Sequence, residues 1–262
     1  MKEFFGIGGY AREAEGFLSW QHLTFVTTLM AIMVTLAVVI GIKNKNKCES
    51  EKNKVLIISA ILIDAVEIFK IVMISIANAD PMRWQYELPL FLCSIQLIAI
   101  PLAAFSKGRV KCAALDFVFI FGLFGAVLGT YGAGNNYAVY PVLSIDNVAS
   151  GITHSISGFA SLYIAISGMA SMKKKDIPIT FGILSGFCIS AYVANITIDY
   201  NYMFLMRGDG TPYDILYTLV NGNPVIYPLS VVGLFLVYIV GFYGIYYLIK
   251  SINKHKIKAY AS

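Results

Sequence analysis

The sequence has few charged residues for its length. Only 13% of its 262 residues are charged, whereas 58% are hydrophobic, and the mean hydropathy is +0.70. A soluble domain of this size cannot bury so much apolar surface, so the composition excludes a soluble globular protein. Apolar runs of about twenty residues recur along the chain, and each is long enough to cross a bilayer as a helix. The chain is therefore expected to be an integral membrane protein.

Cysteine and histidine are also scarce. The four cysteines, at positions 48, 93, 112 and 188, form no Cys-x-x-Cys pair and no cluster with a histidine. We therefore expect no metal site, no disulfide framework and no cofactor. The net charge of +5 comes from short scattered loops, which argues against a nucleic-acid partner and for membrane lipids. No cleavable signal peptide is evident, because no long apolar core follows Lys2.

The apolar runs, with the Gly and Pro residues between them, predict a single all-α domain over 1–262, a bundle of seven membrane-spanning helices. The expected spans are 22–42, 55–77, 88–105, 112–131, 148–171, 178–199 and 225–249. Fifteen of the 20 Lys and Arg residues fall in the loops 43–54, 106–111 and 173–175 or in the tail from Lys250. The positive-inside rule places this side in the cytoplasm, which predicts a multi-pass protein with its N-terminus outside and its C-terminus inside.

Polar side chains inside the expected spans are costly and therefore informative. Asp64, Glu67 and Lys70 form one stripe of the second span, where Glu67 and Lys70 can pair. One face of the sixth span carries a longer polar stripe: Ser185, Cys188, Tyr192, Asn195 and Asp199. Each stripe is either a structural contact inside the bundle or the wall of a polar cavity. Small residues on the fourth and fifth spans indicate close helix packing: Gly122, Gly125, Gly129, Ser157, Ser161 and Gly168.

One thiol and one imidazole are expected at the same depth. If the third span runs inward from about Glu87, Cys93 lies roughly 9 Å below the membrane boundary at 1.5 Å per residue. On the same count His154 lies roughly 10 Å down the fifth span. Lys70 and Asn195 fall at a similar level, whereas the other three cysteines do not. Cys93 is then either a small apolar filler or a nucleophile.

A Cys–His pair is the minimum for thiol nucleophilic catalysis. A neutral imidazole takes the thiol proton during attack, and the resulting acyl thioester passes its acyl group to an alcohol or to water. The tetrahedral intermediate needs hydrogen-bond donors. The candidate substrate-contacting or oxyanion residues are Gln96, Tyr192, Asn195 and Tyr202.

Three short segments together resemble a known family. These are "ELPLFLCS" at 87–94, His154 in the fifth span, and "NYMFL" at 201–205; "SWQHL" at 19–23 also fits. They resemble the YwaF family of bacterial integral membrane proteins and, through it, the eukaryotic transmembrane protein 164, a phospholipid acyltransferase. A more distant similarity is to the androgen-induced hydrolases of fatty-acid esters, which use a threonine nucleophile. The sequence departs from the bacterial pattern at Phe91, where a histidine is frequent, and in lacking Trp at 221–230.

The resemblance implies a seven-helix bundle in which Cys93 is the nucleophile and His154 its partner. It also implies phospholipid partners, an acyl donor and a lysolipid or other acceptor, and a bacterial plasma membrane. The expected orientation and the depth of the pair place the reaction in the outer leaflet. Two other classes of function stay open. One is a transporter or lipid-binding protein whose cavity is lined by Asp64, Glu67, Lys70 and Asp199, and the other is a structural subunit. The absence of an obvious internal repeat favours the enzyme over the transporter.

Overall fold

The computed structural model describes residues 2–260, with side chains as far as Ile252. Every regular element in this part of the chain is a helix, as the composition predicts, and the described residues contain no strand. The chain divides into two compact units, Met1–Ser171 and Met172–Ser262. The prediction of one bundle over 1–262 therefore stays a prediction, and each unit is described by itself.

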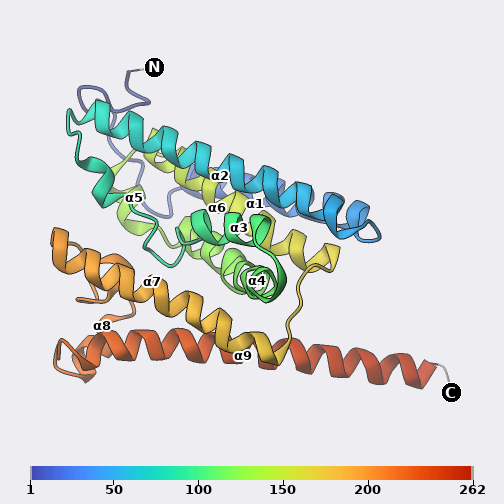
Figure 1. The fold of residues 1–262 in the computed structure, drawn as a ribbon. Coiled ribbons are helices and arrows are strands. Elements are labelled where there is room, and N and C mark those ends of the chain that lie inside the picture. The colour runs from blue at the N-terminus through green and yellow to red at the C-terminus, as the bar shows by residue number, and fades with distance from the viewer. Residues whose placement is uncertain (1, 261–262) are drawn as a thin grey trace. The chain divides into compact units, whose positions relative to one another are not determined.

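The first unit is built around one central helix, α6 (Ile145–Ser167). Helix α6 packs against α1, α2 and α4, while α3 packs between α2 and α4 (Figure 1). A short 3-10 helix, η1, lies in the connection between α2 and α3. The bounds of these other elements are α1 (Trp20–Asn44), α2 (Glu49–Ala77), η1 (Arg83–Tyr86), α3 (Gln96–Phe105), α4 (Gly108–Tyr131) and α5 (Gly134–Val139).

Small residues allow α4 and α6 to approach closely. A Cβ atom on Gly122 would lie 2.8 Å from the Ser157 carbonyl oxygen and 2.9 Å from the Ser161 Cβ atom. The Ser157 hydroxyl donates to the Gly122 carbonyl at 3.1 Å, and the Ser161 hydroxyl donates to the Phe119 carbonyl at 2.8 Å. The packing role predicted for these residues is confirmed. Gly168 serves differently, because it ends α6 in a left-handed conformation with φ of 76°.

The N-terminal segment fixes the beginning of α6. The Ile145 amide donates to the Phe4 carbonyl at 2.8 Å, and the Ser144 hydroxyl caps the helix by accepting from the Asn147 amide at 3.2 Å. The Tyr10 hydroxyl donates to the Asp146 carboxylate at 2.9 Å. These contacts satisfy first-turn groups that a helix leaves without partners, and they hold the helix that carries His154.

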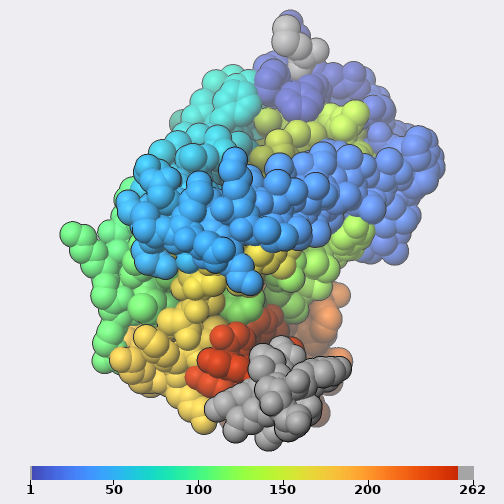
Figure 2. All heavy atoms as spheres, turned by 90° about the vertical axis from the view of Figure 1, so that its right-hand side faces the viewer, coloured from blue at the N-terminus to red at the C-terminus, as the bar shows by residue number. Residues whose placement is uncertain are grey.

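Two of the basic loops lie at the same end of the first unit. The Lys111 ammonium donates to the Asn53 side chain at 2.6 Å, and the Asn53 amide donates to the Ala104 carbonyl at 2.8 Å. The start of α2, the end of α3 and the start of α4 therefore meet. Figure 2 shows this end, with the connection between α1 and α2 in blue facing the viewer. The side chains of Lys254, Lys256 and Lys258, which the orientation prediction also uses, lie outside the described residues.

The third helix is much shorter than predicted. Helix α3 begins at Gln96, so the prediction of a continuous helix over 88–105 is wrong for its first eight residues. Pro89 has no amide hydrogen and disfavours helical geometry in the residue before it, and the Leu90 amide turns back to the Leu88 carbonyl at 2.7 Å. The Ser94 hydroxyl then bonds both the amide and the carbonyl of Phe91, at 3.0 and 3.1 Å. This local bonding competes with a helical hydrogen-bond ladder, so Cys93 lies on a turn.

The second unit contains two long helices and a strained turn. Its elements are η2 (Lys174–Asp176), α7 (Ile177–Ile198), η3 (Tyr202–Phe204), α8 (Asp214–Leu219) and α9 (Ile226–Tyr260). Met203 and Phe204 both have positive φ, 55° and 56°. The Asn195 side chain bonds the amide and the carbonyl of Tyr202, at 2.6 and 3.0 Å, and the Tyr227 hydroxyl donates to the Phe204 carbonyl at 2.8 Å. These bonds hold a backbone conformation that non-glycine residues rarely adopt.

Among the described helices, four are long and apolar enough to cross a membrane by length and composition. These segments are Trp20–Asn44, Gly108–Val139, Lys174–Ile198 and Ile226–Ile252. Helices α2 and α6 have 29 and 23 residues but carry many polar side chains, and α3 has only 10 residues. The chain is thus a helical protein with several apolar helices suited to a membrane, while the count of seven spans and their orientation stay predictions.

Candidate active site

A small cavity in the first unit brings together polar side chains from three parts of the chain. Its volume is about 60 Å³. Helix α2 supplies Ile63, Glu67 and Lys70; the turn and α3 supply Cys93, Ser94 and Leu97; and α6 supplies Ser150, Thr153 and His154. The thiol and the imidazole that depth counting placed at one level thus line the same cavity.

The backbone of α6 fixes the protonation pattern of the His154 ring. The ring atom Nδ1 lies 2.7 Å from the Ser150 carbonyl oxygen and 3.3 Å from the Ser150 hydroxyl. A carbonyl oxygen only accepts, so Nδ1 carries the hydrogen and donates. In the neutral ring, Nε2 then has a free lone pair. This orientation leaves Nε2 as the atom that can act as a base.

The Cys93 thiol and the His154 imidazole line the same cavity and interact electrostatically. Nε2 is buried and makes no hydrogen bond of good geometry to the described residues. We therefore interpret the contact between sulfur and imidazole as a proximity within the cavity that is looser than a hydrogen bond. The backbone amides of Cys93 and Ser94 also lie within hydrogen-bonding range of the sulfur. Amides at the start of a helix favour negative charge on a thiol.

Two glycines of α4 form the wall behind this pair. A Cβ atom on Gly125 would lie 3.3 Å from the Cys93 Cα atom, and a Cβ atom on Gly129 would lie 2.0 Å from both Cδ2 and Nε2 of His154. Real Cβ contacts are never that short, so the imidazole occupies space that any other residue at position 129 would fill.

A network of ion pairs borders the cavity. The Lys70 ammonium lies 2.6 Å from the Glu67 carboxylate and 3.1 Å from the Glu87 carboxylate, and all three side chains are less than 20% exposed. Glu87 also faces the Arg83 guanidinium at 3.7 Å. The pairing of Glu67 with Lys70 is confirmed. Glu67 also interacts electrostatically with the imidazole of His154.

Replacing Lys70 by methionine should strongly destabilise the protein. The change leaves two partly buried carboxylates without their shared cation, a loss that typically costs about 3–5 kcal/mol. Thermal unfolding in detergent, followed by circular dichroism, would show a lower midpoint, partly restored in the Glu67→Gln, Lys70→Met double variant. Lys54→Met is the control, because the Lys54–Glu51 pair is exposed and its loss should leave the midpoint unchanged. Equal midpoints for Lys70→Met and the parent protein would refute a structural role for the network.

Other predicted site residues lie away from this cavity or in the second unit. Asp64 is half-buried on α2 and does not line the cavity. Gln96 is fully buried, and neither polar atom of its amide has a partner among the described residues. Tyr192, Asn195, Asp199 and Tyr202 belong to the second unit. The Asn195 amide is engaged with the Tyr202 backbone, which favours a structural role for both residues. Their contribution to a site stays a prediction.

Sequence reasoning missed several contributors to the cavity. The sequence places Glu87 at the outer end of the third span, with no sign that it completes the ion-pair network. Gly125 and Gly129 were interpreted as packing residues only, although they make room for Cys93 and His154. The Ser150 carbonyl could have been anticipated, because it lies four residues before His154 on the same helix. The described residues contain no group of three side chains that could hold a metal ion.

Comparison with known proteins places the chain in a family. The model of the TMEM164 family matches residues 17–249, which is most of the 262-residue chain. This span includes both Cys93 and His154 and the whole lining of the cavity. No curated protein and no solved structure matches the chain. The chain belongs to the TMEM164 family.

Proposed function

We propose that this protein is a membrane-embedded acyltransferase or esterase that acts on phospholipid acyl chains through an acyl-cysteine intermediate. The observation that carries the proposal is the pairing of the Cys93 thiol with the His154 imidazole in a small cavity. The resemblance to the YwaF family and to the transmembrane protein 164 acyltransferase supports the same chemistry. We further propose a bacterial plasma membrane, from the resemblance to the YwaF family, and an outer-leaflet substrate, from the distribution of basic loops.

The first half-reaction transfers the acyl group to the enzyme. His154 Nε2 takes the proton of Cys93 as the sulfur attacks the ester carbonyl carbon, and the carbonyl π electrons move to its oxygen. When the tetrahedral intermediate collapses, the bond between the carbonyl carbon and the ester oxygen breaks. The imidazolium returns its proton to the departing alkoxide. The products are an acyl thioester on Cys93 and a lysolipid.

The second half-reaction reverses these steps with a different acceptor. A lipid hydroxyl group, or water, gives its proton to Nε2 and attacks the thioester carbonyl. The sulfur leaves as a thiolate and recovers the proton from the imidazolium. A lipid acceptor gives transacylation, and water gives hydrolysis of the starting ester.

Polar and charged groups around the cavity stabilise the negative charge of the oxyanion and the positive charge of the imidazolium. The backbone amides of Cys93 and Ser94 lie near the sulfur, which supports a role for them as donors to the oxyanion. The Lys70 ammonium lines the same cavity. Two of the three Lys70 hydrogens are directed to Glu67 and Glu87, which leaves one donor. Glu67 in turn favours the imidazolium that forms on His154. Asn195 and Tyr192 stay as further proposed donors.

The size of the cavity favours an enzyme over a transporter. Cavities that enclose a whole small molecule have volumes of about 300–1,000 Å³. At about 60 Å³ this cavity has room for a reacting carbonyl group, while the rest of a lipid must lie outside it.

The direct test is to trap the intermediate. Protein in nanodiscs is incubated with a phospholipid, quenched in acid and digested, and the peptide containing Cys93 is examined by mass spectrometry. We expect an acyl adduct on Cys93 that neutral hydroxylamine removes, since a thioester is labile to this reagent and an oxygen ester is much less so. In His154→Gln, adduct formation should slow by about 10²–10⁴, the usual contribution of a general base. An adduct on any other residue, or an equal rate without the imidazole, would refute the mechanism.

A further inference from the structure

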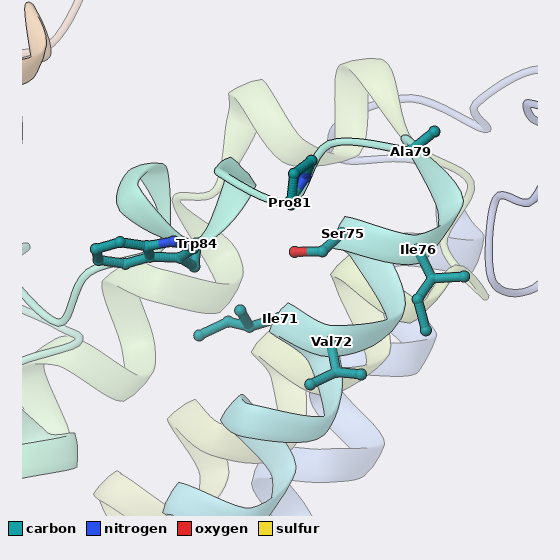
Figure 3. Close-up of a pocket in the computed structure, with 7 residues that line it drawn as sticks. All are labelled: Ile71, Val72, Ser75, Ile76, Ala79, Pro81 and Trp84. Atoms are coloured by element: carbon teal, nitrogen blue, oxygen red, sulfur yellow. The ribbon is translucent and has the colours of Figure 1, made fainter.

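A large apolar groove lies beside the small polar cavity in the first unit. Its volume is about 550 Å³, within the range of sites that hold drug-sized ligands. Helix α2 forms one side of the groove with Ile71, Val72, Ser75 and Ile76. The other side is formed by Ala79 and Pro81 of the connection after α2 and by Trp84 of η1. Figure 3 shows the Ser75 hydroxyl pointing into the space bounded by Ile71, Pro81 and Trp84.

The groove and the polar cavity follow one another along a single face of α2. Residues four apart on a helix lie on the same face, one turn above the other. Ile63 and Glu67 line the polar cavity, and the next two positions of this series, Ile71 and Ser75, line the groove. A molecule that extends along this face therefore meets the cavity at one end and the groove at the other.

The connection between α2 and α3 belongs to both sites. Pro81 and Trp84 line the groove, whereas Cys93 and Ser94 line the cavity. Between them lies the Arg83 guanidinium, 3.7 Å from the Glu87 carboxylate and 5.8 Å from the centre of the Tyr86 ring. The Arg83 side chain is 34% exposed, and its buried Nε atom has no hydrogen-bond partner among the described residues. A guanidinium with spare donors is suited to a phosphate group.

We propose that the groove binds one acyl chain of a glycerophospholipid whose phosphate lies at Arg83 and whose ester carbonyl reaches Cys93. An apolar chain fits the lining residues, an anionic phosphate complements the guanidinium, and the common face of α2 joins the two ends. This inference rests on the proposed function and adds to it the groove that binds the acyl chain and the residue that binds the phosphate.

Binding can be measured through Trp84, because the protein has only two tryptophans. In Trp20→Phe, Trp84 is the only tryptophan fluorophore. Nanodiscs are prepared with a small fraction of a phospholipid brominated on its acyl chain, which quenches nearby indole fluorescence. If the groove binds phospholipid selectively, the quenching of Trp84 exceeds the value expected from the brominated fraction alone. Adding an unbrominated phospholipid should displace the brominated lipid from the groove and remove this excess quenching. Quenching that simply follows the brominated fraction would show ordinary lipid-facing surface and overturn the proposal.

Variants of the single-tryptophan protein locate the effect. Ser75→Phe places a ring in the groove and should abolish the excess quenching. Leu62→Phe is the matched control, because Leu62 is an exposed residue of α2 that lines neither site, and it should leave the quenching unchanged. Arg83→Gln should remove the preference of the groove for a brominated phospholipid over a brominated diacylglycerol. Excess quenching that persists in Ser75→Phe would place the bound lipid elsewhere.

Turnover separates this proposal from the proposed function. Ser75→Phe should raise KM for a long-chain phospholipid about tenfold, while kcat for a short-chain ester is retained. One outcome is that Cys93→Ala shows excess quenching while the parent protein shows no turnover. The groove then binds lipid, and the catalytic proposal fails. If the parent protein turns over substrate but shows no excess quenching, the groove proposal fails and the chemistry stands.

Discussion

Replacing Cys93 by alanine is expected to reduce acyl transfer at least about a thousandfold. Removing the nucleophile eliminates the covalent route, and nucleophile deletions in other acyl-transfer enzymes have effects of this size or larger. His154 and the charged groups stay in place, so lipid should still bind. The measurement is turnover of a phospholipid with a labelled acyl chain in nanodiscs, with the folded fraction of each variant determined by circular dichroism.

The matched control is Cys188→Ala. Cys188 is buried, whereas Cys93 is half-buried. Cys188 lies in the second unit, where its sulfur contacts the Met203 sulfur at 3.7 Å. Its loss should leave turnover close to that of the parent protein. Full turnover in Cys93→Ala would contradict the mechanism. Cys93 would then be a small apolar residue of the bundle, and the polar cavity would need an explanation based on binding or transport.

The second large effect is expected from a single methyl group. In Gly129→Ala the added carbon would lie 2.0 Å from Cδ2 and Nε2 of His154, so the ring has to rotate or α4 has to move. A displacement of about 1 Å at a catalytic group lowers the rate about a hundredfold. The misfit should also destabilise the protein by about 1–3 kcal/mol, as other overpacked cores do.

Two further glycines provide the comparison for Gly129. Gly125→Ala brings a methyl group 3.3 Å from the Cys93 backbone, a tight contact that small shifts relieve, so its effect should be intermediate. Gly186→Ala, in α7, meets no other atom within 4 Å and should have no effect on turnover. Alkylation of Cys93 by iodoacetamide in each variant would report whether the thiol is still accessible. Equal turnover for Gly129→Ala and Gly186→Ala would show that the imidazole position does not matter.

Composition and hydrophobic runs were sufficient to predict an all-helical membrane protein. They were less reliable where local chemistry interrupts a helix. The depth of Cys93 was calculated at helical rise over residues 88–95, but Pro89 and the Ser94 hydroxyl make this segment a turn. The structure nevertheless places Cys93 and His154 in one cavity, because the turn that contains Cys93 lines this cavity together with α2 and α6.

The remaining features of the site depend on contacts between distant segments. The sequence shows that Gly129 is small, but only the packing of α4 against α6 shows that an imidazole fills the vacant space. Likewise, Glu87 finds Lys70 seventeen positions earlier only after the chain has reversed direction through η1. Helical periodicity relates residues within one turn or two, and it carries no information about such partners.

The turn that contains Cys93 resembles the turn that holds the nucleophile in soluble esterases. In a nucleophile elbow, a sharp bend just before a helix lifts the reactive atom clear of the backbone and turns the adjoining amides toward it. Cys93 occupies the same kind of bend, with two amides near its sulfur and α3 starting three residues later. The sulfur can therefore approach a carbonyl from an open side without unwinding a helix, while the imidazole stays fixed in the middle of α6. An ester embedded in a bilayer would meet a nucleophile on a bend and a base within a helix.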